Sequence, residues 1–355
     1  MKKIRRFAEL LLAAAMLITL VSCGGGGGGG PAASQPSKDA GSGEKIKIKV
    51  SLTTPKTHEN YIRTEEMCNA INEDCGGVFD FELYPSDALG DWTLVSEEVV
   101  RGNVEMSVSS FACTNLAADL VWAPYLATSY DQALKVFSQD GFIYKTIEDI
   151  YYEEGVTLLG YDFMGFDGLA FGSKYPAEGD VLDGGEGLII RTSGEDHLTR
   201  MVTAMGYSPT NMAWTEIYTS LQTGVIDGFT GCAPTLAYTQ FADVLDCYVD
   251  CHMLTEIVPI FVNNSFFESL TEEQQAAFRK HAGTMFESSV AATQEEGDAY
   301  FEKLESEYGV KVIRTEQEKI DALAEYCRTE CWPCLEPLLG EELYNQMIEY
   351  YHSLA

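Results

Sequence analysis

Three cysteines towards the C-terminal end of the sequence have a spacing that could do chemistry. Cys327, Cys331 and Cys334 follow a CxxxCxxC pattern, which is the spacing of an iron–sulfur cluster-binding loop. The segment that carries them has a helical pattern, in which these three positions share one face. A buried-thiol or disulfide role is simpler for side chains placed in this way. We therefore treat a cluster-bearing enzyme as a weaker alternative.

Other motifs for catalysis or cofactor binding are missing from the sequence. It contains no GxxxxGK[ST] phosphate loop, no GxGxxG after a strand and no GxSxG elbow. The histidines form neither HxxxH nor HExxH, so we expect no zinc site. Acidic side chains are numerous, and no partner motif marks any of them as a general acid or base. We predict a protein that is not an enzyme and that needs no cofactor or metal.

Arg191 has the best placement for binding a ligand. It ends the apolar stretch Gly-Leu-Ile-Ile-Arg over residues 187–191, which has the pattern of a short buried strand. Ligands of α/β sheets bind beyond the carboxyl ends of the strands. A guanidinium there matches a carboxylate in bidentate geometry. The alternative is a surface arginine in a salt bridge, because the protein is very acidic.

Alternating strand and helix patterns position this arginine. The expected strands cover residues 45–53, 79–84, 104–109, 155–161, 169–172, 187–191 and 310–313, with a strand and turn over 225–228. The expected helices cover 59–71, 91–101 and 215–223, and another runs from Ser193, as N-cap with Asp196 as its partner, to Gly206. Thr271 is the expected cap of a long helix that breaks near Gly297, and two further helices follow residue 313. This order predicts an α/β fold.

The first 44 residues have the pattern of an export signal and a tether. Four basic residues precede an apolar stretch over residues 7–21. This stretch is shorter than the apolar stretch that a transmembrane helix needs. Leu-Val-Ser-Cys over residues 20–23 is typical of a bacterial lipobox, which predicts a signal peptide over 1–22 and lipid attachment at Cys23. In residues 23–44, Cys23 is followed by a run of glycines over 24–30, which predicts a flexible tether. An ordinary signal peptide with a coincidental cysteine is the alternative.

The charge excludes several classes of partner. The chain of 355 residues has 55 acidic and 23 basic side chains, for a formal net charge of −32. Removal of residues 1–22 would leave 54 acidic and 19 basic side chains and a net charge of −35. Nucleic-acid binding needs clustered Lys and Arg, and an anionic lipid surface would repel this chain. We expect neither partner, and contact with a membrane through the lipid anchor alone.

Nine cysteines lie beyond the predicted lipid-attachment site. Export permits disulfides, and an odd number leaves at least one of them unpaired within the chain. An anaerobic source, in which thiols persist, is an equal explanation. The sequence does not pair them: they are Cys68, Cys75, Cys113, Cys232, Cys247, Cys251, Cys327, Cys331 and Cys334.

Several stretches together resemble one family. Residues 84–110 contain YPSDALG followed by a helical stretch, residues 122–130 read WAPYLATSY, and residues 267–275 read FESLTEEQQ. The longest match is MGYSPTNMAWTEIYTSLQTGVIDG, which ends at Gly228. These stretches resemble the solute-binding proteins of TRAP transporters, the DctP family, over residues 45–350.

The resemblance implies a fold, a function and partners. The fold is periplasmic-binding-protein-like, with two α/β lobes joined by hinge strands and a long helix and a ligand cleft between the lobes. Counting along the chain puts residues 45–166 and 257–296 in lobe I, and residues 167–256 and 297–355 in lobe II. The implied protein is a monomeric extracytoplasmic receptor that closes on a small organic acid. It would deliver this acid to a membrane permease.

The resemblance also implies ligand-binding residues. Arg191 matches the arginine that clamps the ligand carboxylate in the family, and Trp214 matches an aromatic residue that packs against the ligand, although core packing alone is an alternative. Counting from the signatures adds a set of cleft positions, which are Thr53, Trp92, Ser110, Phe111, Asp167 and Gly231.

Two departures from the family pattern bear on the ligand. Asp167 stands where relatives that bind sialic acids carry a second arginine, and it would repel a second carboxylate or pair with an amine or hydroxyl groups. Gly231 stands where relatives often have asparagine, so Cys232 could move towards the cleft. With Trp92 and Trp214 both in the cleft, we expect an apolar, aromatic or amine-bearing monocarboxylate. We expect neither a sialic acid nor a C4-dicarboxylate.

Two other kinds of exported lipoprotein are alternatives to this interpretation. An ABC-type solute-binding lipoprotein would share the broad architecture, although the stretch that ends at Gly228 argues against it. A structural or adhesive surface lipoprotein would share the signal and tether without binding a solute.

Overall fold

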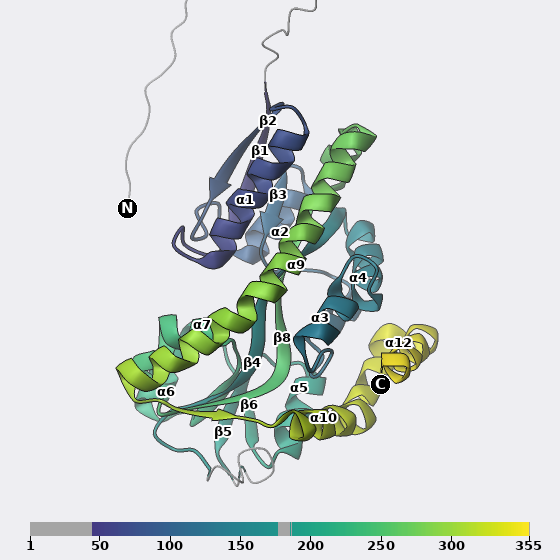
Figure 1. The fold of residues 1–355 in the computed structure, drawn as a ribbon. Helices are drawn as coiled ribbons and strands as arrows, with labels where there is room; N and C mark the ends of the chain where they lie inside the picture. Colours follow the sequence, from purple (N-terminus) through teal and green to yellow (C-terminus); the bar gives the residue numbers. More distant parts are fainter. Residues whose placement is uncertain (1–44, 177–184, 186, 355) are drawn as a thin grey trace, which may run out of the picture. The chain divides into compact units, whose positions relative to one another are not determined.

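The structure is a computed structural model that describes residues 45–176, residue 185 and residues 187–354. The chain divides into a unit of residues 1–42 and a unit of residues 43–355, and the second unit contains every element shown in Figure 1. The predicted signal peptide, the lipid-attachment residue Cys23 and the tether lie outside the described residues. No helix in the described part of the chain is long and apolar enough to cross a membrane.

One mixed sheet forms the centre of this unit. Its strands are β1 (Ile46–Leu52), β2 (Phe79–Tyr84), β3 (Met106–Val108), β4 (Val156–Phe171), β5 (Ile189–Thr192), β6 (Ser208–Asn211), β7 (Gly228–Cys232), β8 (Cys247–Asn263) and β9 (Lys311–Arg314). The order is β2-β1-β3-β8-β4-β7-β5-β6, and β9 pairs with β8. The expected strands are confirmed, except that 155–161 and 169–172 are parts of the single strand β4, and that the strand expected from residue 225 begins at Gly228.

The sheet has two parallel parts joined by a long antiparallel pair. Strands β1, β2 and β3 are mutually parallel, and so are β5, β6 and β7. Between them run β4 and β8, which pair antiparallel along almost their whole lengths of 16 and 17 residues. Figure 1 shows this pair extending from one parallel part to the other. Parallel strands need covering helices on both faces, which is what the helix layers provide.

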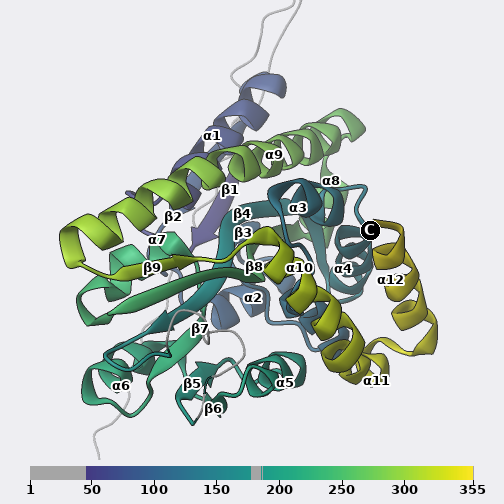
Figure 2. The ribbon, with the colours of Figure 1, turned by 60° about the horizontal axis from the view of Figure 1, so that its bottom comes forward.

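The helices cover both faces of the sheet. They are α1 (Glu59–Asp74), α2 (Trp92–Val100), α3 (Tyr130–Phe137), α4 (Phe142–Glu153), α5 (Asp196–Ala204), α6 (Ile217–Thr223), α7 (Pro234–Leu236), α8 (Asn264–Ser269), α9 (Glu272–Lys303), α10 (Gln317–Tyr326), α11 (Glu336–Leu339) and α12 (Glu341–Leu354). Around β1–β3, α1 and α9 pack on one face and α2 on the other (Figure 2). The α/β class is therefore confirmed.

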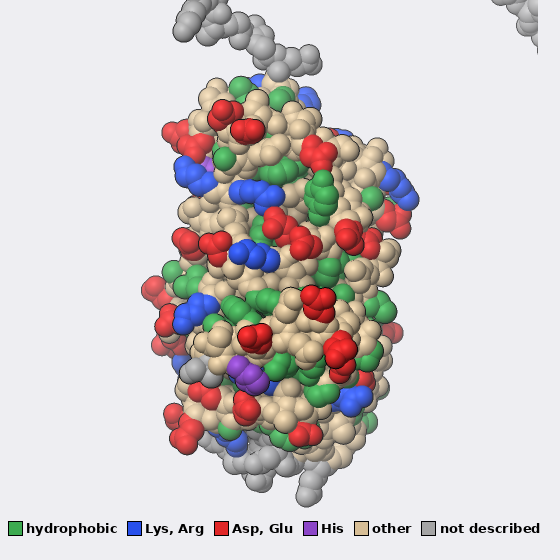
Figure 3. Space-filling view, turned by 90° about the vertical axis from the view of Figure 1, so that its right-hand side faces the viewer, with side chains coloured by type: hydrophobic (Ala, Val, Ile, Leu, Met, Phe, Trp, Pro, Cys, Tyr) green, Lys and Arg blue, Asp and Glu red, His purple; other side chains and the backbone are tan. Residues whose placement is uncertain are grey.

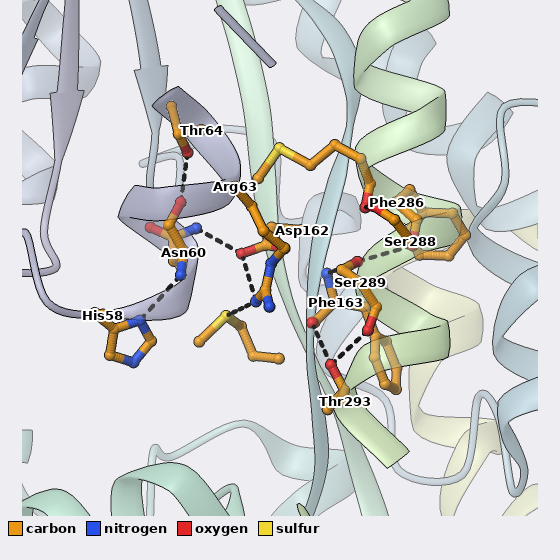
Figure 4. Close-up of polar contacts among 12 residues, drawn as sticks. His58, Asn60, Arg63, Thr64, Asp162, Phe163, Phe286, Ser288, Ser289 and Thr293 are labelled. Atoms are coloured by element: carbon orange, nitrogen blue, oxygen red, sulfur yellow. Dashed lines mark hydrogen bonds and ion pairs between the residues drawn. The ribbon is translucent and has the colours of Figure 1, made fainter. Parts of the chain in front are cut away.

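Helix α9 crosses the long strand pair. Thr271 caps it in a capping box with Gln274, as predicted. Halfway along, Ser289 Oγ accepts a hydrogen bond from Phe163 N at 3.0 Å, and Thr293 Oγ1 donates to Phe163 O at 3.1 Å (Figure 4). The predicted break near Gly297 is wrong, because α9 continues through this residue to Lys303. The glycine is buried in the helix, so packing offsets its low helix propensity.

A buried ion pair joins α1 to the same stretch of β4. Asp162 is fully buried and accepts hydrogen bonds from Arg63 Nε at 2.7 Å and from Asn60 Nδ2 at 2.7 Å (Figure 4). Arg63 is itself largely buried, and its Nη2 reaches the second oxygen of Asp162 at 3.2 Å. The buried charge of Asp162, at the middle of β4, is thus compensated by Arg63.

Strand β4 is bent where it passes α9. Its pairing with β8 shifts register between Leu158 and Gly160, between Phe163 and Gly165, and between Asp167 and Leu169. Such bulges bend a strand and increase its twist. A side chain at Gly160 would lie 3.2 Å from Ala282 O of α9, so this glycine allows the helix to approach closely.

The chain after β9 is more broken than the two helices predicted. Helix α10 continues into a π-helix over Cys327–Cys331 and a 3₁₀ turn, before α11 and α12. Trp332 Nε1 donates to Pro124 O at 2.9 Å and Tyr351 Oη to Leu126 O at 2.8 Å, which ties this segment to the loop before α3. Cys327 and Cys331 are buried thiols and Cys334 is partly buried. Within the described ranges, no three Cys, His, Asp or Glu side chains are arranged to hold a metal ion.

The start of α5 also differs from the prediction. Helix α5 begins at Asp196 with Glu195 as its N-cap residue, and no side chain caps it. The Ser193 hydroxyl donates instead to the Glu195 carboxylate at 2.5 Å, so it is not free to cap the helix. Residues 193–195 therefore form a loop between β5 and α5, and Ser193 and Glu195 of this loop line the cavity described below.

Carboxylates dominate the surface of this unit. Figure 3 shows one face, on which Asp and Glu side chains are scattered from end to end and Lys and Arg side chains lie among them. This distribution follows from the composition, in which acidic side chains outnumber basic ones.

Candidate ligand-binding site

A cavity of about 490 Å³ lies where the two parallel parts of the sheet face each other. Its walls come from the start of α2, the loop after β3, the 3₁₀ helix over Leu116–Trp122, the middle of β4 and β8, and the ends of β5 and β7. Parallel strands from both parts therefore end at this space, which is where α/β sheets bind ligands.

The structure brings together almost all of the predicted ligand-binding residues. Those that line the cavity are Trp92, Ser110, Phe111, Asp167, Arg191, Trp214 and Gly231. Thr53 is not among the lining residues: β1 ends at Leu52, and Thr53 is exposed in the turn that follows. The predicted strand extends to Thr53, whereas β1 ends one residue earlier. Contact of the other side chains with a ligand stays a prediction.

Arg191 is fixed at its Nε by the backbone just after β6, the strand next to its own. Its side chain is 7% exposed, and its Nε donates to Met212 O at 3.0 Å. The guanidinium carbon lies 5.8 Å from the centre of the Trp214 ring. Burial lowers the pKa of Arg191 from its ordinary value, yet the side chain stays charged because arginine is such a strong base. No ion pair to a described carboxylate uses the remaining N–H groups.

Two neighbours shape the space around this guanidinium. Trp214 packs edge-on against Phe229 and Phe241, with ring centres 6.0 and 5.4 Å away, so it serves both the core and the cavity wall. Gly231 has a φ of +82°, and a side chain there would lie 3.9 Å from Arg191 Nη1. The glycine thus leaves room beside the guanidinium. Cys232 is fully buried and is not a lining residue, so it does not fill that room.

Aromatic side chains form much of the remaining wall. Trp92 is the first residue of α2 and is 44% exposed. Phe111 packs against Tyr151 with the ring centres 4.7 Å apart. Trp122 and Tyr151 also line the cavity, and neither was predicted as a site residue. Trp122 belongs to the WAPYLATSY stretch, so the sequence did contain a signal for it.

Two carboxyl groups lie side by side in the cavity. Asp167 on β4 is 1% exposed, and Glu256 comes from the paired strand β8. Burial and the nearby Glu256 raise the pKa of Asp167 well above its ordinary value. Burial also raises the pKa of Glu256 to about 7. Glu256 was missed because β8 was not predicted, and without that strand nothing in the sequence pointed to this residue.

The cavity is acidic as a whole. Among the described residues that line it, Arg191 is the one cation, and Asp119, Asp167, Glu195 and Glu256 are carboxyl groups. Burial, together with the charge of Glu195, raises the pKa of Asp119. A concave, largely apolar space with several aromatic walls and a few convergent charged groups is typical of a site for a small organic molecule. Its chemistry is recognition of a charged ligand by hydrogen bonds and ion pairs.

Comparison with known proteins finds similarity to proteins that bind small solutes. The family model of the bacterial extracellular solute-binding proteins, family 7 (DctP), matches residues 50–330. The sialic acid-binding periplasmic protein SiaP of Vibrio cholerae is 21% identical over 299 residues, which are 82% of this chain and 84% of that protein.

Two solved structures illustrate the similarity of fold. A TRAP periplasmic solute-binding protein of Ochrobactrum anthropi has a TM-score of 0.77 at 20% identity, over 88% of this chain and 96% of that one. A TRAP periplasmic solute-binding protein of Chromohalobacter salexigens with bound D-glucuronate has a TM-score of 0.70 at 22% identity, over 85% and 99%. At these identities the likeness concerns the fold.

The fold and the cavity define a solute-binding protein of the periplasmic-binding type, with two α/β lobes, hinge strands and a long helix. The family model covers well over half of the chain. The chain belongs to the bacterial extracellular solute-binding proteins of family 7, the DctP family. The alternative of an ABC-type lipoprotein is not supported.

Proposed function

We propose that this protein captures a small organic acid in the cavity and holds the acid's carboxylate on Arg191. The observation that carries the proposal is a buried guanidinium that faces the cavity while its Nε is fixed on Met212 O at 3.0 Å. Burying a guanidinium whose remaining N–H groups have no partner costs free energy, unless a bound anion accepts hydrogen bonds from them. A carboxylate is the anion that this fork fits best.

The comparisons support an acid as the ligand. The solved structure from C. salexigens holds D-glucuronate, and the V. cholerae relative is named for sialic acid. This chain differs where a second cation would be needed, because Asp167 and Glu256 occupy that part of the cavity. We therefore propose a monocarboxylate with apolar, aromatic or amine character, in preference to a sialic acid or a C4-dicarboxylate.

Capture would proceed by closure of the two lobes. We assign residues 45–166 and 257–296 to lobe I, and residues 167–256 and 297–355 to lobe II. The bulges of β4 near Gly165 lie at the proposed boundary, where a few backbone angles could absorb the rotation. Closure would exclude water from the cavity, so that one charge-assisted pair discriminates strongly between ligands.

Delivery would require a membrane permease and a position outside the cytoplasmic membrane. Family membership supports both. We further propose that lipid attached to Cys23 anchors a monomeric receptor through the residue 24–44 tether. Mass spectrometry of the mature N-terminus would test the anchor, since an unmodified chain that starts elsewhere than Cys23 would contradict it.

Calorimetric titration of Arg191 variants tests the carboxylate anchor. Arg191→Lys keeps the charge without the fork, and Arg191→Met removes both. Loss of one partner of a buried charge pair costs about 2–5 kcal/mol, so we expect Arg191→Met to weaken binding of an acid by about 30-fold or more. Arg200→Met is the matched control, because Arg200 is exposed and pairs with Asp196 within α5.

The ligand panel contains monocarboxylates, uronic acids and succinate. Arg191→Met with wild-type affinity would refute the anchor. Tight binding of succinate without binding of any monocarboxylate would refute the proposed ligand class.

A further inference from the structure

We propose that Asp167 and Glu256 together bind a cationic ammonium group, so that the acid taken by this cavity is a zwitterion. This rests on the proposed function, because Arg191 would bind the carboxylate of the same ligand. The inference adds a second binding position to the cavity and narrows its ligands from organic acids to amino acids in the broad chemical sense.

The first observation is a pair of buried carboxyl groups without a cation. Both oxygens of Asp167 are buried and accept no hydrogen bond from an N–H or hydroxyl donor in the described part of the chain. Their hydrogen-bonding neighbour is the Glu256 carboxyl, which is itself an acid and brings no positive charge. Neither residue forms an ion pair with a described Lys, Arg or His, in contrast to the equally buried Asp162, which Arg63 and Asn60 satisfy. Buried charged groups are normally paired.

The charge of the pair fits one ammonium group. Two adjacent carboxyl groups resist losing both protons, because the first negative charge opposes the second. The pKa of Glu256 is raised to about 7 and that of Asp167 well above its ordinary value. Burial and the closeness of the two groups thus disfavour the doubly ionised pair. Binding of an ammonium group would supply the missing positive partner and N–H donors at once.

The charge of the whole cavity points the same way. Arg191 faces four lining carboxyl groups, namely those of the pair and of Asp119 and Glu195. A simple anion would gain one guanidinium and meet this excess of negative groups. A zwitterion pairs with both signs, and its ammonium group gains further from the faces of Trp92, Trp122 and other aromatic walls.

The sheet sets the distance between the two charged positions. Adjacent strands β8, β4, β7 and β5 carry Glu256, Asp167, Gly231 and Arg191 in that order. Neighbouring strands lie about 4.8 Å apart, so β7 separates the acidic pair from the guanidinium. On β7, Gly231 has no side chain, and the space above it is where the ligand would connect its two charged ends.

Matched ligand pairs test the inference by calorimetry on protein freed of carried-over ligand by unfolding and refolding. In each pair a hydroxyl replaces the ammonium group: L-phenylalanine and L-phenyllactate, β-alanine and 3-hydroxypropionate, 5-aminovalerate and 5-hydroxyvalerate. We expect at least one zwitterion to bind, and its hydroxy analogue to bind at least about 30-fold more weakly. Failure of every zwitterion to bind, or equal affinity within a pair, would overturn the proposal.

Variants assign the effect to the carboxyl pair. Glu256→Gln and Asp167→Asn keep the shapes of the side chains, and we expect each to reduce the preference for the zwitterion at least about tenfold. Glu97→Gln removes the same charge at an exposed position and should leave the preference unchanged. Preferences that survive both cavity variants would also overturn the proposal. The Glu256 side chain is only partly buried, whereas that of Asp167 is almost fully buried. Glu256→Gln therefore remains informative if Asp167→Asn does not fold.

The two proposals fail in different ways. If D-glucuronate binds through Arg191 and no zwitterion does, the organic-acid receptor stands and the ammonium site is wrong. If a zwitterion binds with wild-type affinity to Arg191→Met, the carboxylate anchor of the proposed function is wrong.

Discussion

The pH dependence of folding stability provides a test of the acidic pair without any ligand. The pKa of the Glu256 carboxyl is about 7 in the folded protein, against an ordinary value of 4.5. Between these two values the folded state binds more protons than the unfolded state. Stability contributed by this group is therefore fully present below about pH 4.5 and is lost as the pH rises through about 7.

The size of this effect follows from the shift. One pKa unit corresponds to about 1.4 kcal/mol, so a shift from 4.5 to about 7 corresponds to about 3 kcal/mol across this window. Asp167 shifts in the same direction. The other titratable groups that face the pair are the thiols of Cys232 and Cys251 and the Tyr248 hydroxyl. Burial raises the pKa of all three, so they stay neutral throughout.

Urea unfolding at several pH values between 4.5 and 7.5 would measure this contribution. Because many surface carboxylates also titrate, the informative quantity is the difference between wild type and Glu256→Gln. We expect this difference to change by about 3 kcal/mol in favour of the variant as the pH rises. Glu97→Gln should run parallel to the wild type, because Glu97 is exposed. If Glu256→Gln also runs parallel, within about 1 kcal/mol, the reasoning about the buried pair is refuted.

Three further predictions concern the scaffold. Arg63→Met leaves Asp162 buried without its cation and should cost about 3–5 kcal/mol in urea unfolding, and the double variant with Asp162→Leu should recover much of this; equal losses would contradict a compensated pair. Thr271→Ala removes the cap of α9 and should cost about 1 kcal/mol, whereas Thr271→Ser should not; thermal melts that coincide for both would contradict the cap. Gly297→Ala meets no atom closer than 3.9 Å and should raise the melting temperature, whereas Gly160→Ala meets Ala282 O at 3.2 Å and should lower it; the opposite order would contradict the packing described for α9.

Local patterns were enough to predict much of the fold. Strand β2, the stop of α6 at Gly224 and the N-cap of α9 at Thr271 match the prediction closely, because turn glycines, capping residues and periodic apolar residues determine them locally. Strand β8 escaped prediction since its CYVDCHMLTEIVPIFVN stretch has polar residues that alternate only in part. Its extended conformation depends on pairing with β3, β4 and β9, which lie far away in the sequence.

In the candidate site, too, residues in local motifs were predicted, whereas residues that depend on the pairing of distant strands were not. Arg191 and Trp214 lie in a long specific motif, and the cavity contains both. Asp167 was noticed as a departure from a pattern, but its significance depends on Glu256, which the register of β4 against β8 brings beside it. Thr53 does not line the cavity, since β1 ends one residue earlier, at Leu52, and Thr53 is exposed; its contact with a ligand stays a prediction. Contacts across strands need a register, and a single sequence does not supply one.

The long-range pairing of β3 has a consequence for the order of folding. Met106 on β3 pairs with Val262 on β8, and Asn263 Nδ2 donates to Val99 O at 2.9 Å. The first three strands therefore lack their neighbour until more than 150 further residues have been synthesised, and α9 comes later still. Contacts so distant in sequence form slowly, because closing long loops costs entropy before any contact forms. In a chain built in this way, the N-terminal strands therefore complete their pairing only after most of the protein has been synthesised.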